Sequence, residues 1–165
     1  MDSLYTRSMA TVPLNIVLVH PEIPNNTGNI GRTAAATGCR LHVIHPIGFD
    51  MSEKACRRAG LDYWHLVDCH EHDSWQAFLA AESPRRAWLF TTKADHSYWE
   101  ADFEPDDYLL FGAESKGVPE AVHQWVTSQH GETHRVRMPM EKPARSLNLA
   151  TAVCAAVYEA RRQLQ

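Results

Sequence analysis

The chain has 165 residues, of which 44% are hydrophobic and 22% charged. This composition is typical of one globular domain and excludes a disordered chain. The net charge of −4 argues mildly against nucleic-acid binding, because phosphate contacts need clustered lysines and arginines. Basic residues do gather locally, so a basic face and ordinary solvated charges stay equally open. They are Arg57, Arg58, Arg135, Arg137, Lys142, Arg145, Arg161 and Arg162.

The four cysteines are widely spaced and form no CxxC pair, so we expect neither a disulfide framework nor a zinc finger. This usage fits the reducing cytoplasm. No apolar run approaches the roughly 20 residues that a membrane helix needs. Residues 1–13 lack the apolar core of a secretory signal. We expect them to be a flexible N-terminal extension of a single domain over residues 14–165.

Along the chain, apolar patterns predict strands that alternate with helices. In order, we expect a strand at 14–19, a loop at 20–26, a helix at 27–37, a strand at 40–45, a helix at 53–59, a strand at 63–67, a helix at 73–81, a strand at 87–91, a loop at 94–106, a strand at 108–111, a helix at 119–126, a strand at 135–138 and a helix at 146–164. This alternation favours an α/β fold, with a mainly parallel sheet flanked by helices on both faces.

Three loops stand out where strands are expected to end, the usual place for function in such folds. The first, residues 20–33, has two glycines that let a phosphate approach backbone N–H groups, followed by Arg32. The second, residues 110–119, has glycines at 112 and 117 around Glu114. Taken alone, a helix cap with an exposed arginine explains the first loop slightly better than function does. A simple turn explains the second equally well.

The third loop, residues 137–149, contains two prolines that stiffen the approach to Ser146. Ser146 can cap the last helix, and Asn148 can satisfy backbone groups in the bend. Pure capping and a functional role are about equally good interpretations of Ser146 considered alone.

Together the segments NIVLVHPEIPNNTGNIGRT, RRAGLDYW, TTK, FGAESKG and PARSLNLATAVCAAVYEARRQ closely resemble the motifs of the SpoU–TrmD (SPOUT) superfamily. The best match is its tRNA (cytidine/uridine-34) 2′-O-methyltransferase family, over about residues 14–163. The resemblance implies a SPOUT fold with a deep C-terminal trefoil knot, a homodimer, S-adenosylmethionine as cofactor and the tRNA anticodon loop as partner. It implies 2′-O-methylation of the ribose of wobble nucleotide 34.

The resemblance also implies roles for individual residues. Arg32 and Asn26 match the catalytic positions; because arginine stays protonated, we expect Arg32 to stabilise charge and grip a phosphate, and Asn26 to orient the loop or contact the ribose. The implied cofactor contacts are Phe90, Thr91, Gly112, Glu114, Gly117, Met138, Ser146, Leu147 and Asn148. The implied RNA contacts are Arg145, Tyr158 and Arg162.

Several alternatives stay open. The chain could methylate another tRNA site or rRNA, or be a non-catalytic RNA-binding module; a nucleotide-dependent oxidoreductase is disfavoured because GxGxxG is missing after the first strand. Cys69-His70-Glu71-His72 is the densest group of metal-ligand types, but no other residues have the spacing to complete a site. We therefore expect structural or surface roles for it, and no metal.

Overall fold

The computed structural model describes residues 14–165, and the extension expected over residues 1–13 lies outside the described residues. The strands are β1 (Asn15–Val19), β2 (Arg40–Ile44), β3 (Cys69–His72), β4 (Ala87–Phe90), β5 (His96–Ser97), β6 (Tyr108–Phe111) and β7 (Arg135–Arg137). The helices are α1 (Pro24–Thr37), α2 (Glu53–Arg58), α3 (Trp75–Glu82), α4 (Glu120–His130) and α5 (Leu149–Gln163), with short 3-10 helices η1 (Trp64–Leu66), η2 (Tyr98–Glu100) and η3 (Glu132–His134).

The seven strands form one sheet in the order β3-β2-β1-β6-β4-β7-β5, and all of its pairings are parallel. The central strand β1 lies between β2 and β6, with Ile16 level with Leu41 on one side and Leu109 on the other. Its five residues are all buried. The predicted parallel α/β fold is thereby confirmed.

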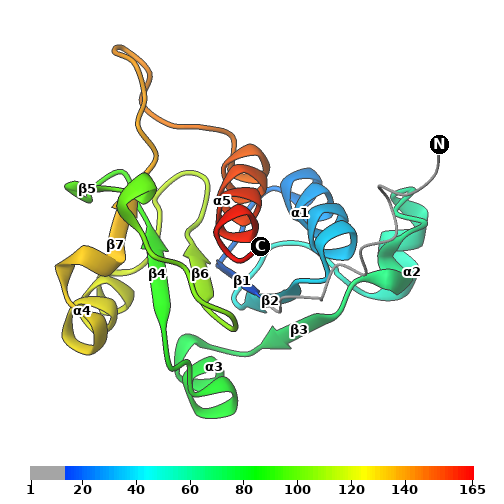
Figure 1. The fold of residues 1–165 in the computed structure, drawn as a ribbon. Helices are drawn as coiled ribbons and strands as arrows, with labels where there is room; N and C mark the ends of the chain where they lie inside the picture. Colours follow the sequence, from blue (N-terminus) through cyan, green and yellow to red (C-terminus); the bar gives the residue numbers. More distant parts are fainter. Residues whose placement is uncertain (1–13) are drawn as a thin grey trace.

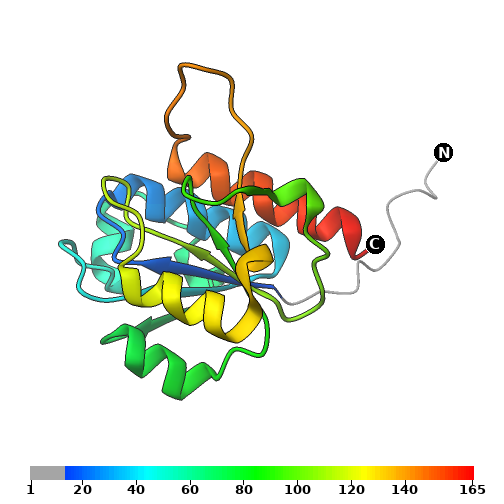
Figure 2. The same ribbon diagram turned by 90° about the vertical axis from the view of Figure 1, so that its left-hand side faces the viewer.

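The sheet is covered on both faces (Figure 1). One face carries α1 and α5, whose Ile30 and Val157 are fully buried against it. The other face carries α3 and α4, whose Phe78 and Val126 are fully buried. Helices α1 and α5 lie side by side, and the loop after β7 projects beyond them (Figure 2). Within the described residues, no helix is long and apolar enough to cross a membrane.

Two expected elements differ near the third strand. Residues 63–67 are not a strand: Trp64–Leu66 form η1, and the strand is β3, at Cys69–His72. Here the backbone bonds locally, from the Leu66 N–H to the Tyr63 carbonyl. The aromatic side chains contact α1, since the Tyr63 hydroxyl donates a hydrogen bond to the Gly28 carbonyl and the Trp64 ring lies against Gly31. The polar β3 becomes a strand because it pairs with the edge of β2, so tertiary pairing outweighs its weak β-propensity.

Helix boundaries also differ. Helix α1 begins at Pro24, inside the expected loop, because proline is tolerated in a first turn, where its missing N–H costs nothing. Helix α5 begins at Leu149 and not at 146, so the interpretation of Ser146 as its cap is wrong. The cap is Asn148, whose side chain accepts a hydrogen bond from the Thr151 N–H at 3.2 Å. The loop expected over 94–106 contains β5 and η2.

Candidate functional site

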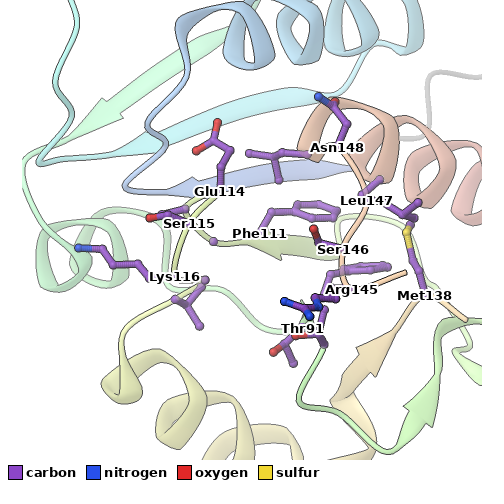
Figure 3. Close-up of a pocket in the computed structure, with 18 of the residues that line it drawn as sticks. Thr91, Phe111, Glu114, Ser115, Lys116, Met138, Arg145, Ser146, Leu147 and Asn148 are labelled. Atoms are coloured by element: carbon purple, nitrogen blue, oxygen red, sulfur yellow. The ribbon is translucent and has the colours of Figure 1, made fainter. Parts of the chain in front are cut away.

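The three loops singled out in the sequence meet at the carboxyl edge of the sheet. They surround an open cleft of about 640 Å³, within the range of roughly 300–1,000 Å³ typical of ligand sites. Figure 3 shows the labelled side chains around it: Glu114, Ser115 and Lys116 come from the loop after β6, and Leu147 and Asn148 from the segment before α5. The cleft lies where parallel α/β sheets usually bind ligands.

Glu114 joins the second loop to the start of α1. Its carboxylate accepts hydrogen bonds from the N–H groups of Glu22 at 2.7 Å and Ile23 at 3.1 Å, and from Asn26 Nδ2 at 3.2 Å. Ile23 is the N-cap of α1, and its side chain makes no capping bond. A carboxylate here also faces the positive end of the helix dipole. Glu114 therefore caps α1 from a distant part of the chain.

Glu22, just before α1, in turn binds the second loop. Its carboxylate accepts hydrogen bonds from the Ser115 N–H at 3.0 Å and the Ser115 hydroxyl at 2.7 Å. These bonds lower the pKa of the Glu22 carboxyl, because they favour its charged form. The two glutamates thus tie their loops together reciprocally.

Asn26 extends the connection to the third loop. Its Oδ1 accepts a hydrogen bond from Asn148 Nδ2 at 3.0 Å, while its Nδ2 donates to Glu114. Asn26 is only 7% exposed. The chain of contacts Glu114–Asn26–Asn148 therefore joins three segments that lie far apart in the sequence, and Asn148 also caps α5.

The glycines shape the second loop. Ala113 and Gly117 exchange backbone hydrogen bonds of 3.1 and 2.9 Å, and Gly117 has a φ of 69°, which glycine adopts without strain. A Cβ added at Gly112 would lie 2.2 Å from the carbonyl carbon of Gly117. Gly112 is therefore required by the turn itself.

All nine residues implied as cofactor contacts line this one cleft, as do Asn26 and Arg145. Their roles stay predictions, but their convergence is a finding. Phe90 and Met138 pack against the main core and, with Leu147, give the cleft apolar walls.

Three other predicted residues lie outside the lining of the cleft. Arg32 is exposed on α1, and its guanidinium lies 4.6 Å from the centre of the Tyr63 ring. Tyr158 on α5 is 54% exposed. Arg162 donates hydrogen bonds to the carboxylate of Glu159 at 2.8 and 2.9 Å.

The cleft also includes side chains that our sequence analysis did not single out, such as Lys93, Lys116 and His123. His123 is 5% exposed, and its Nδ1 has no hydrogen-bond partner among the described residues. Burial, followed by nearby Arg135, lowers its pKa, which favours the neutral ring. The TTK segment could have pointed to Lys93, but nothing in the local sequence distinguishes His123.

A model of the SpoU rRNA Methylase family matches residues 13–158. The chain is 45% identical over 150 residues to the tRNA (cytidine(34)-2'-O)-methyltransferase of Saccharophagus degradans, covering 91% of this chain and 95% of that one. This chain belongs to the SpoU rRNA Methylase family. The SpoU relative of the same name from Escherichia coli K12 is 45% identical, covering 92% and 94%.

Solved structures agree with the SpoU assignment. One, from work on the 2-OH methylation of C/U34 on tRNA, matches with a TM-score of 0.80 and 49% identity, covering 93% of this chain and 97% of that one. Another is the SpoU methyltransferase AviRb from Streptomyces viridochromogenes in complex with AdoMet. It matches with a TM-score of 0.74 and 26% identity, covering 99% of this chain and 65% of that one. The family resemblance inferred from the motifs is confirmed.

Proposed function

We propose that this protein is an S-adenosylmethionine-dependent methyltransferase that modifies the ribose 2′-OH of cytidine or uridine 34 in tRNA. The observation that carries the proposal is the single cleft built by the Glu114–Asn26–Asn148 contacts. It occurs in a chain 45% identical, over nearly its whole length, to tRNA (cytidine(34)-2'-O)-methyltransferases.

The cleft suits an adenosyl cofactor. Phe90, Met138 and Leu147 offer apolar walls for an adenine ring. The unpaired Nδ1 of buried His123 is a polar atom that a bound ligand would satisfy. When bound, S-adenosylmethionine would supply an electrophilic methyl group. The protein's part is mainly to position it against the ribose oxygen.

Asn26 acts as a positioning residue in this proposal. Both of its amide atoms are engaged, one by Glu114 and one by Asn148. Of the two roles that the motif allowed, orienting the loop is therefore favoured over contacting the ribose. Asn26 would hold the start of α1 against the cofactor loops.

Arg32 would work on the RNA side. Its guanidinium is exposed and stacked on Tyr63, whose hydroxyl is itself held by the Gly28 carbonyl at 2.6 Å. A fixed, permanently charged fork can grip a phosphate and stabilise the charge that develops on the ribose oxygen. We assign no proton abstraction to it.

A homodimer completes the proposal. Arg32 lies outside the lining of its own chain's cleft, and the large side chains of Leu147 and Tyr158 are 46% and 54% exposed. A second copy packed on α5 would cover them and bring another set of arginines, including Arg162, to the RNA. With Arg145 at the cleft, this arrangement would offset the net charge of −4 locally.

We also infer that the C-terminal segment is threaded as a deep trefoil knot, and that the enzyme works in the cytoplasm, where tRNA is modified. The path of the chain supports the first inference. Strand β7 lies between β4 and β5, and the chain then crosses back to place α5 beside α1 (Figure 2).

Methyl transfer tests the proposal. Purified protein, S-adenosylmethionine and bulk tRNA should yield a 2′-O-methyl group at position 34, mapped by mass spectrometry, with Arg32→Ala as the matched inactive control. Sedimentation should give a dimer. A methyl group elsewhere in tRNA or in rRNA would overturn the assigned target, and RNA binding without cofactor binding would make the chain a non-catalytic module.

A further inference from the structure

A group of side chains of the types that ligate metals lies at the edge of the sheet, outside the cleft. It consists of His42 in β2, His72 in β3 and Glu82, the last residue of α3. His42 is fully buried and His72 is 8% exposed. Both histidine rings pack edge-on against Phe78 of α3, with centroid distances of 5.7 and 5.2 Å. The register of β2 and β3 thus projects both imidazoles toward α3.

The three potential ligand atoms enclose one point in space. His42 Nδ1 lies 3.1 Å from His72 Nε2, and Glu82 Oε1 lies 3.9 Å from each of these nitrogens. The nearest point equidistant from the three atoms lies in their plane, about 2.1 Å from each. Zinc in proteins binds imidazole nitrogen at about 2.0–2.1 Å and carboxylate oxygen at about 2.0–2.2 Å.

Neighbouring side chains hold His42 in the tautomer that metal binding requires. Asn15 Nδ2 donates to the carbonyl and the carboxylate of Asp106 at 3.2 and 3.1 Å, which turns Asn15 Oδ1 toward His42 Nε2 at 3.3 Å. His42 Nε2 must then carry the hydrogen, and its Nδ1 presents a lone pair. Such outer hydrogen bonds orient metal-binding histidines.

The carboxylate of Glu82 is also oriented by a neighbouring side chain. The Tyr108 hydroxyl donates to Glu82 Oε2 at 3.3 Å, leaving Oε1 directed at the two nitrogens. At 3.9 Å from each, Oε1 is too far for a hydrogen bond to either imidazole. A proton shared between the histidines explains their own 3.1 Å separation but leaves this oxygen unused. A central cation would engage all three atoms.

We propose that His42, His72 and Glu82 bind one divalent transition-metal ion of the zinc class, with water as the fourth ligand. The ion would join β2, β3 and the end of α3, and so stabilise an edge of the sheet. None of the three residues lines the cleft, so this inference goes beyond methyl transfer and is independent of it. Local spacing predicted no metal, because the sheet and α3 bring the ligands together from separate elements.

Metal titration of the full chain, without a histidine tag, tests the proposal. After removal of metals with a chelator, Co²⁺ should bind at one ion per chain with the visible absorption of tetrahedral coordination, and Zn²⁺ should displace it. His72→Gln should abolish this absorption. Tyr108→Phe should weaken Co²⁺ binding by about 10- to 100-fold, as expected for loss of an outer partner.

His70→Gln is the matched control. His70 lies on the same strand and its ring stacks on His42, but its Nε2 is engaged by Asp68 at 2.7 Å, so the variant should keep the Co²⁺ absorption. If His72→Gln does not fold, Glu82→Gln should give the same loss, since it keeps an acceptor for Tyr108. Tetrahedral absorption retained in Glu82→Gln, or absent from the wild type, would overturn the site.

Discussion

Replacing Asn26 by aspartate tests the contact at the centre of the cleft. In the wild type, the Asn26 Nδ2 group donates a hydrogen bond to Glu114 Oε1 at 3.2 Å. Asn26→Asp preserves the shape of the side chain but replaces this donor with a carboxylate oxygen. At that distance two unit charges repel by about 1.3 kcal/mol in bulk water and about 5 kcal/mol at an effective dielectric constant of about 20. Because Asn26 is nearly buried, we expect a loss of about 2–4 kcal/mol in the free energy of unfolding.

The matched control is Asn25→Asp, which makes the same charge change at an exposed position in the first turn of α1. A carboxylate there meets the favourable end of the helix dipole and should cost nothing. Urea unfolding at about pH 8 measures both variants.

The loss in Asn26→Asp should depend on pH. Repulsion raises the pKa of the carboxyl pair in the folded state above that of the unfolded chain. The penalty is therefore absent below the unfolded pKa of about 4 and grows as the pH rises through the folded value. At about pH 5.5 the two variants should differ less than at pH 8. Equal stability of the two variants at both pH values would refute the assigned contact.

Three further results are expected. Arg32→Ala should cut turnover and leave the affinity for S-adenosylmethionine nearly unchanged, because the side chain is exposed outside the cleft lining; a large loss in calorimetric affinity would contradict this. Gly112→Ala should abolish cofactor binding, since its methyl group would lie 2.2 Å from backbone of Gly117; unchanged affinity would argue against the turn. Asp107→Asn should cost about 3–5 kcal/mol in urea unfolding, because this fully buried carboxylate accepts three hydrogen bonds, whereas exposed Asp102→Asn should cost nothing.

Local sequence was sufficient for the central strands. Residues 14–19, 87–91 and 108–111 are short apolar runs, and each is a buried strand within a residue or two of the expected bounds. Such runs have few alternatives, because a parallel strand covered on both faces has a nearly continuous run of apolar residues. The loops at their ends followed from the same pattern, and the motif order made the family recognisable.

Edge elements and helix starts were harder to predict. The strand expected at 63–67 is η1, and the polar residues 69–72 form β3 instead. Ser146 and Asn148 are both good N-cap residues. In the structure Asn148 is the cap, and it is also the residue that donates a hydrogen bond to Asn26. Each outcome depends on partners distant in the chain.

The sequence by itself therefore determined the class of fold, the order of the central elements and the three segments that carry the site, because these depend on neighbouring residues. Only the tertiary structure decided that Glu114 caps α1 and contacts Asn26, and that His42, His72 and Glu82 converge at the sheet edge. The physical reason is that such contacts depend on strand register and helix packing, which join residues separated by tens of positions and leave no periodic signal in the sequence.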